Sequence, residues 1–150
     1  MTSAKATGGA HFSAGEGLEL RFGPNRIQFK VDELCGATGL CLMTSSFPPG
    51  AGYPFLHVHR SFEEMFYVLE GEVAYQLGGD RVVARAGSTI FIAAGTPHRF
   101  KGVGAGPARI IVVYSTPRAL TMIKDIVDAG PDRNRHAEIF LRHDSYLIAD

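Results

Sequence analysis

The stretch FLHVHRSFEEMFYVLEG, residues 55–71, decides the fold of this chain. It contains two apolar segments with the alternation of a β-strand, and it ends at a glycine that indicates a turn. Successive side chains of a strand point to opposite faces, so His57 and His59 point the same way, about 6.6–6.8 Å apart along the strand. This separation suits two ligands of one ion.

The same alternation identifies a third ligand. Glu64, Phe66 and Val68 share one face of the second segment, and the two apolar residues place that face in the interior. A carboxylate buried alone would take up a proton or cost several kcal/mol, and a divalent cation shared with the histidines removes this penalty. Glu63, on the opposite face, is the alternative acid. A histidine pair that is only solvated or hydrogen-bonded is the alternative to a metal site.

The chain around this stretch predicts a β-rich domain. Apolar and polar residues alternate in short segments separated by glycines, among them Gly71, Gly87 and Gly95. Short strands at this spacing favour a closed sandwich or a small barrel. In such a fold the strands pair around the closed sheet, so their edges are not left exposed. Residues 18–22 and 26–31 flank a Gly-Pro-Asn turn and predict a hairpin.

The two ends of the chain depart from this pattern. Residues 1–17 are small, polar and glycine-rich, and we expect a flexible N-terminal arm. We expect residues 18–150 to form one domain, with an amphipathic helix from about 117 to 129 that packs on the barrel or caps its mouth. The tail, residues 132–150, is charged and then apolar, which indicates a further helical turn and a closing strand.

Composition excludes several classes of protein. The 150 residues include 15 Lys plus Arg and 15 Asp plus Glu, so there is no charge excess to attract nucleic acid or anionic lipid. No segment has the ~20 apolar residues of a membrane span, and the start lacks the apolar stretch of a signal peptide. We therefore expect a cytoplasmic protein with no nucleic-acid or membrane partner. Cys35 and Cys41 fit no disulfide framework or zinc knuckle and are predicted to be free thiols.

A third histidine strengthens the interpretation of a metal site. His98 follows a short apolar strand and a glycine turn in GSTIFIAAGTPHRF, residues 87–100. Three histidines and a glutamate in this order resemble the two motifs of the cupins, G-x5-H-x-H-x3 or 4-E-x6-G and G-x5-P-x-G-x2-H-x3-N. The first glycine, the proline and the asparagine of these motifs do not match, and none of them is a ligand in the family. The resemblance covers about residues 45–113.

The resemblance implies an all-β fold, the cupin double-stranded β-helix or jelly-roll barrel, here with an N-terminal β arm and a C-terminal α-helix. It also implies one divalent transition metal per chain, and the ligand types exclude calcium while fitting Fe, Mn, Ni, Co, Cu or Zn alike. Cupins of this size often form dimers through N-terminal strands, so we expect a homodimer. The implied ligands are His57, His59, Glu64 and His98.

The local sequence is most similar to the small cupins grouped with quercetin 2,3-dioxygenase. This similarity implies a dioxygenase that acts on an enolic or phenolic aromatic substrate, flavonol-like or polyketide-like, with dioxygen as the second substrate. Glu64 would be the catalytic base. A redox-neutral cyclase, isomerase or lyase of polyketide metabolism is one alternative, and a non-catalytic module that binds a small molecule is another.

The expected substrate pocket is apolar and aromatic, which suits a planar molecule that presents one or two oxygens to the metal. Charged sugar phosphates are not expected, because no lysine or arginine falls clearly on the inward face and Arg99 should point away from His98. The predicted lining residues are Phe47, Phe55, Phe66, Val68, Phe91, Phe100, Val112 and Tyr114, with Met43 and Tyr75 as further candidates.

Overall fold

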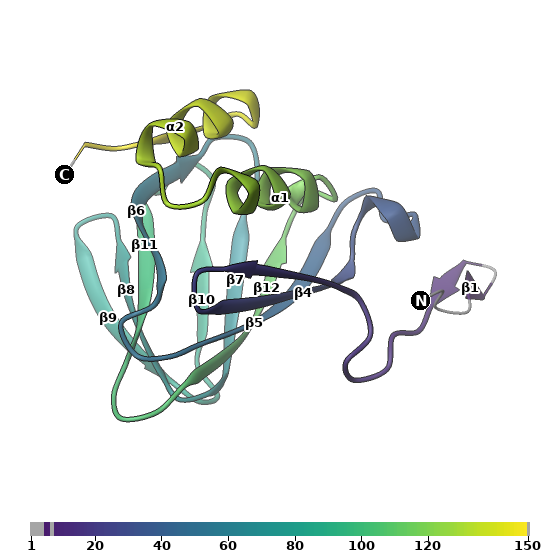
Figure 1. The fold of residues 1–150 in the computed structure, drawn as a ribbon, viewed down its shortest axis with the longest axis horizontal. Helices are drawn as coiled ribbons and strands as arrows, with labels where there is room; N and C mark the ends of the chain where they lie inside the picture. Colours follow the sequence, from purple (N-terminus) through teal and green to yellow (C-terminus); the bar gives the residue numbers. More distant parts are fainter. Residues whose placement is uncertain (1–4, 7, 150) are drawn as a thin grey trace.

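The computed structural model describes residues 5, 6 and 8–149. Two antiparallel sheets form a barrel, and two helices lie together over one end of it (Figure 1). The strands are β1 (Lys5–Ala6), β2 (Gly9–Ala10), β3 (Leu18–Phe22), β4 (Asn25–Val31), β5 (Cys41–Phe47), β6 (Gly52–His59), β7 (Glu64–Glu70), β8 (Glu72–Leu77), β9 (Asp80–Arg85), β10 (Thr89–Ile92), β11 (His98–Val103), β12 (Ala108–Tyr114) and β13 (Ser145–Leu147). The helices are the 3-10 turn η1 (Glu33–Cys35), α1 (Ala119–Ala129) and α2 (Arg133–Arg142).

The strand order follows from long-range antiparallel pairing. One sheet has the order β10-β7-β12-β5-β4-β3, and the other has the order β13-β6-β11-β8-β9. The second sheet sets β6 directly beside β11, so the histidine pair and the later histidine become neighbours. The expected all-β jelly-roll barrel with a helical C-terminus is therefore confirmed, and the tail adds a second helix and a closing strand.

The alternation of β7 is the one predicted from its sequence. Glu64, Phe66 and Val68 are buried, whereas Met65 and Tyr67 are about 40% exposed on the outer face. The inward residues of β7 join those of β12 and β5 in one apolar core. Burial of these large side chains from water is the main favourable term that holds the sheets together.

The turn between β7 and β8 requires a glycine. Gly71 has a φ of +77°, in the left-handed region, and a Cβ atom there would lie 2.5 Å from the carbonyl oxygen of Pro107. Any larger residue would clash with this backbone, so the turn packs closely against the start of β12 only with glycine at this position.

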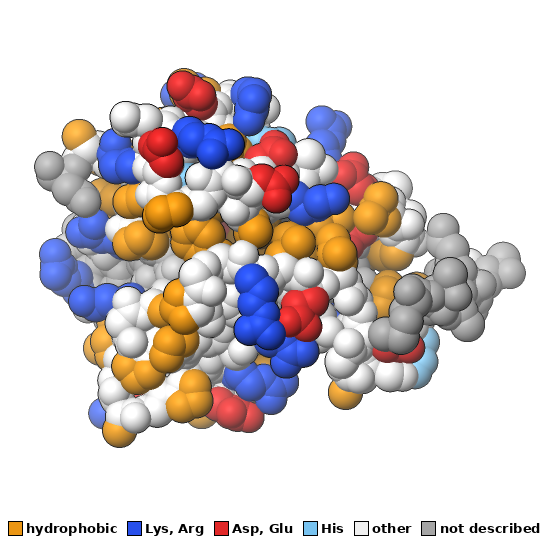
Figure 2. Space-filling model, in the orientation of Figure 1, with side chains coloured by type: hydrophobic (Ala, Val, Ile, Leu, Met, Phe, Trp, Pro, Cys, Tyr) orange, Lys and Arg blue, Asp and Glu red, His pale blue; other side chains and the backbone are white. Residues whose placement is uncertain are grey.

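The predicted helix is confirmed as α1. It buries Leu120, Met122, Ile123 and Ile126 toward the end of the barrel, so its apolar face packs on the protein itself. In the space-filling view, hydrophobic side chains gather in a band beneath the helices (Figure 2). Within the described part of the chain, no helix has the length and apolar character needed to cross a bilayer.

The N-terminal segments differ in how they join the barrel. The hairpin of β3 and β4 is confirmed, and β4 pairs with β5, so the hairpin completes the chain's own sheet. The arm contains the two-residue pairing of β1 with β2. Residues 1–4 and 7 lie outside the described residues, and the flexibility of the arm stays a prediction. Both cysteines are free thiols, with Cys41 fully buried.

Candidate metal centre

Four predicted ligands meet at one point inside the barrel. His57 and His59 come from β6, Glu64 begins β7 and His98 begins β11. One ligand atom from each residue lies within 4.8 Å of the ligand atoms of the other three, and all four side chains are buried. The strand pairing explains the meeting, since His98 lies opposite His57 in the register of β11 and β6.

Hydrogen bonds fix which ring nitrogen of each histidine faces the centre. The Nδ1 atoms of His57 and His98 lie 2.8 and 2.9 Å from the carbonyl oxygens of Phe55 and Thr96. A carbonyl oxygen only accepts, so each Nδ1 carries the proton and donates it. The opposite nitrogen, Nε2, then presents a lone pair to the centre.

The third imidazole is held in the same way by the C-terminal strand. The hydroxyl of Ser145 donates to the carbonyl of His143 at 3.1 Å, so its oxygen accepts from Nδ1 of His59 at 2.8 Å. Nε2 of His59 therefore also presents a lone pair inward. Partners that orient metal-binding histidines in this way are typical of metal sites.

The carboxylate of Glu64 is the fourth of the groups that can donate a lone pair to a cation at this point. Its Oε2 atom lies 2.9 Å from Nε2 of His98 and 3.5 Å from Nε2 of His59. Two lone pairs that face each other at these distances repel, unless a proton or a metal ion lies between them. Three imidazole nitrogens and one carboxylate oxygen form a donor set that fits a divalent transition metal.

Charges in the cluster favour a bound cation. Burial acts to raise the pKa of Glu64, but hydrogen bonds with His59 and His98 outweigh it, and the pKa lies well below its usual range. Burial holds the pKa of His57 well below its usual value, and the neighbouring histidines lower it further. Burial also lowers the pKa of His59. Burial acts to lower the pKa of His98, but the hydrogen bond and the charge of Glu64 outweigh it and raise that pKa. The centre therefore holds an ionised carboxylate beside neutral His57 and His59, and a metal ion would compete with a proton at His98.

Aromatic rings stack on two of the histidine ligands. Phe140 of α2 stacks on His57, with 5.2 Å between ring centroids and an interplanar angle of 1°. Phe62 stacks on His59 at 4.4 Å. Sequence reasoning missed both rings and also Ser145. Phe62 could have been identified from the sequence, because it lies between His59 and Glu64. Phe140 and Ser145 could not, because nothing in the sequence around them indicates a metal site.

A hydrogen-bonded pair, half-buried Tyr53 and buried His136, connects the helical cap to the same strand. The hydroxyl of Tyr53 on β6 donates to Nδ1 of His136 at 2.8 Å, and Nε2 of His136 donates to the carbonyl of Gly130. The Tyr53 ring meets His57 edge-on, with 5.0 Å between centroids. His136 is fully buried, so this histidine outside the metal cluster positions α2 above the centre.

A narrow apolar cavity of about 80 Å³ lies against the ligands. Among the predicted lining residues, Phe100, Tyr114 and the further candidate Met43 line it. Phe47, Phe66, Val68 and Val112 belong to the core behind it, while Phe55 and Tyr75 line a neighbouring groove. The cavity is closed from the helical side by Met122, Ile123, Ile126, Val127 and Phe140.

The prediction that Phe91 lines the pocket is wrong. Phe91 lies on β10 opposite Met65 of β7, and it is 58% exposed. The alternation of β10 turns Ile92 inward and Phe91 outward, so strand register and not side-chain size decides its face. Glu63 is likewise exposed, so the acid in the cluster is Glu64, as the alternation predicts.

Replacing Ser145 with alanine should weaken metal binding by about 10- to 100-fold, because the hydroxyl that orients His59 is lost. Metal affinity measured by competition with a coloured chelator tests this. Ser61→Ala, at an exposed loop serine, is the control and should bind metal like the wild type. Equal affinities for the Ser145→Ala variant and the wild type would contradict the role of Ser145.

Comparison with known proteins places the barrel in a family. Residues 43–114 match the family model of the cupin domain. An uncharacterised protein of Methanocaldococcus jannaschii is 30% identical over 75 residues, which are 50% of this chain and 60% of that protein. The match thus spans less than two thirds of the relative.

Two solved structures extend the comparison. The polyketide cyclase RemF from Streptomyces resistomycificus is 28% identical, with a TM-score of 0.55, over 61% of this chain and 65% of RemF. KdgF from Halomonas sp. is 17% identical, with a TM-score of 0.58, over 66% of this chain and 86% of KdgF, which is a likeness of fold. A barrel with this topology and family match is a cupin domain. Residues 43–114 of the chain therefore form a cupin domain.

Proposed function

We propose that this protein is a mononuclear metal-dependent enzyme that acts on an enolic or phenolic aromatic substrate. The observation that carries the proposal is the convergence of three imidazoles and one ionised carboxylate at one point, beside an apolar cavity that His57, His59 and Glu64 line. A divalent metal bound there would act as a Lewis acid toward a substrate oxygen. The metal's identity is left open, because these ligand types suit several transition metals.

The chain's own residues would bind the substrate, exclude water and move a proton. His57, His59 and His98 are held by partners outside the cluster, so they serve as fixed ligands. Glu64 is the acceptor for the hydroxyl proton of the substrate, since it is the ionised carboxylate at the cavity. The apolar side chains of α1 and the ring of Phe140 keep bulk water from this step.

Two reactions can follow this proton transfer. The similarity to a polyketide cyclase at 28% identity favours a redox-neutral ring closure or isomerisation of a polyketide-like phenol. The dioxygenase expected from the sequence is the second candidate, in which both atoms of dioxygen enter the enol and no separate reductant is needed. A non-catalytic binding module would hold the same ligand without turnover.

The test begins with metal analysis of protein purified without a chelator. Anaerobic titration with flavonols, catechols and polyketide phenols, followed by absorbance, then identifies a bound ligand. Conversion without oxygen supports the cyclase, and conversion that begins when oxygen is admitted supports the dioxygenase. A ligand that binds and persists under both conditions would contradict an enzyme that acts on this substrate class.

We also propose that two copies of the chain associate through the outer face of the larger sheet. Phe91, Met65 and Tyr67 lie exposed on neighbouring strands of that face, and such a grouped apolar surface is typical of a protein contact. Phe91→Asp should convert a dimer to a monomer in light-scattering mass measurements. Leu141→Asp, at an exposed residue of α2, should leave the dimer intact. A monomeric wild type would contradict the proposal.

A further inference from the structure

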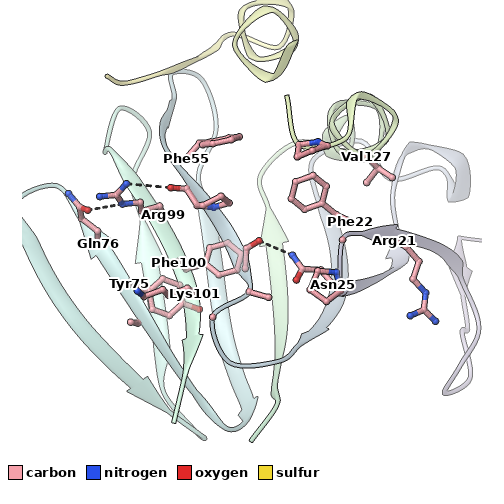
Figure 3. A pocket seen from close by; sticks show the side chains of 18 of the residues that line it. Arg21, Phe22, Asn25, Phe55, Tyr75, Gln76, Arg99, Phe100, Lys101 and Val127 are labelled. Atoms are coloured by element: carbon pink, nitrogen blue, oxygen red, sulfur yellow. Dashed lines mark hydrogen bonds between the residues drawn. The ribbon is translucent and has the colours of Figure 1, made fainter. Parts of the chain in front are cut away.

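A groove of about 890 Å³ opens at the surface beside the metal cavity. Figure 3 shows Phe55, Arg99 and Gln76 on one side of it, and Phe22 and Val127 on the other. The first side comes from β6, β11 and β8, and the second from the β3–β4 hairpin and α1. The groove therefore lies where the hairpin and the helical cap meet the smaller sheet.

The groove and the metal cavity share a common boundary. The residues that line both of them are Phe22, Asn25, Gly52, Phe100 and Val127. Sites for small molecules usually enclose about 300–1,000 Å³, so the cavity of about 80 Å³ holds only the reacting end of a substrate. The rest of the molecule must extend across this boundary into the groove.

The boundary is built from closely approaching backbone. A Cβ atom on Gly52 would lie 2.5 Å from the carbonyl oxygen of Phe100, and Gly52 has a φ of +149°. The side-chain nitrogen of Asn25, Nδ2, donates to the carbonyl oxygen of Gly52 at 2.8 Å. This bond ties the hairpin to β6, and the side chains of Phe22, Phe100 and Val127 form the rest of the boundary.

Asn25 also offers an unused hydrogen-bond acceptor at this boundary. Its nitrogen must face Gly52, because a carbonyl only accepts, so its Oδ1 atom points elsewhere. Within the described residues, Oδ1 of Asn25 and the hydroxyl of Tyr75 are the buried side-chain polar atoms without a partner. Both residues line the groove, and Asn25 is only 6% exposed. A buried acceptor of this kind favours a ligand that brings a hydroxyl or N–H donor.

Cationic side chains flank the outer part of the groove. Arg81, Gln76 and Arg99 lie opposite one another on β9, β8 and β11, and Arg99 donates to Gln76 at 2.9 Å (Figure 3). Lys101 lies two residues beyond Arg99 on the same face. The lining residues include no aspartate or glutamate. Outward-facing arginines, which the sequence placed away from the metal, thus border the entrance to it.

We infer that this groove is the entrance and outer binding site for an anionic substrate. The substrate is an aromatic or enolic molecule that places its hydroxyl end in the cavity, its apolar body past Phe22 and Val127, and a carboxylate or phosphate beside Arg99 and Lys101. The inference rests on the proposed function, since it extends the same site. Carboxylates and phosphates are the anions that the planar guanidinium group of arginine binds with paired hydrogen bonds.

The test is equilibrium binding to the metal-loaded protein, followed by ligand fluorescence. The probes are 6-hydroxy-2-naphthoate, its neutral methyl ester and 6-hydroxy-2-naphthyl phosphate, and the last separates phosphate from carboxylate recognition. The wild type should bind at least one anion about tenfold more tightly than the ester. Raising the salt concentration should narrow this preference, because exposed charges are screened.

Variants of the groove residues test where the anion binds. Lys101→Gln and Arg99→Gln should each reduce the preference for the anion, and the double variant should abolish it. Arg85→Gln, at an exposed arginine outside the groove lining, should keep it. Val127→Trp should weaken binding of the anion and the ester alike by obstructing the entrance, whereas Leu141→Trp should not.

Equal affinity for ester and anions in the wild type would overturn the inference. A preference that survives in the Arg99→Gln, Lys101→Gln double variant would also overturn it, as would unchanged binding in Val127→Trp. The readout does not depend on turnover. A protein that prefers anions but converts no phenol would count against the proposed function alone, and conversion of neutral phenols without an anion preference would count against the groove alone.

Discussion

Treatment with a metal chelator should lower the melting temperature of the wild-type protein by about 10 °C. A ligand that binds only the folded state, present at 1,000 times its dissociation constant, stabilises that state by about 4 kcal/mol. In a chain of this length, each kcal/mol changes the melting temperature by about 2–4 °C. Without the ion, the lone pairs of the histidines and the carboxylate of Glu64 face one another in a buried site.

The variant His59→Ala should show no change in melting temperature on chelation, because it has lost the metal beforehand. Scanning calorimetry with and without chelator measures this, and elemental analysis gives the metal content of each sample. His11→Ala, which removes an exposed histidine outside the barrel, should respond to the chelator like the wild type. A chelator effect of equal size in His59→Ala would place the metal elsewhere in the chain.

The four residues of the centre were predictable because the motifs and the strand period act locally. Side chains two positions apart in a strand point to the same face, so the pairing of His57 with His59 needed no knowledge of the fold. The same rule distinguished Glu64 from Glu63. His98 had a weaker local signal, its place after a strand and a glycine turn, and the resemblance to the cupins added the rest, since only the pairing of β11 with β6 brings it to the other ligands.

The residues that hold the ligands could not be predicted in the same way. Ser145 is 86 residues from the histidine that it orients, and nothing near it in the sequence marks that contact. The error at Phe91 has a different cause. An aromatic residue in an apolar strand was assigned to the interior by type, although β10 has room inside only for the alternate residues. The sequence therefore did not determine two features of the site. One is the contacts between segments distant in the chain, and the other is which residues of a short strand face the interior.

The outer groove shows how an outward-facing residue can still belong to a binding site. The alternation of β11 predicted that Arg99 points away from His98, and on this ground charged sugar phosphates were not expected as substrates. In the structure, the outward face of β11 borders the groove that leads into the barrel. That expectation therefore applies to the narrow cavity, whereas the outward face of β11, in the middle of the smaller sheet, supplies the cations that the interior lacks.

The variant Glu64→Gln should lose turnover by about 10²- to 10⁴-fold, which is the usual contribution of a general base. Glutamine has the shape of glutamate, so its carbonyl oxygen can still face His98 and the other ligands, and most of the metal should remain bound. The amide cannot accept the proton of the substrate hydroxyl. The measurements are the turnover number with the most reactive phenol and the metal content per chain.

Glu63→Gln is the matched control, because Glu63 precedes Glu64 in the chain and its side chain is exposed. It should keep both metal and turnover. If Glu64→Gln instead loses metal in proportion to activity, the lost turnover follows from the lost metal, and Glu64 acts only as a ligand. Unchanged turnover in Glu64→Gln with full metal content would remove the carboxylate from the chemistry, since no step would then depend on its charge.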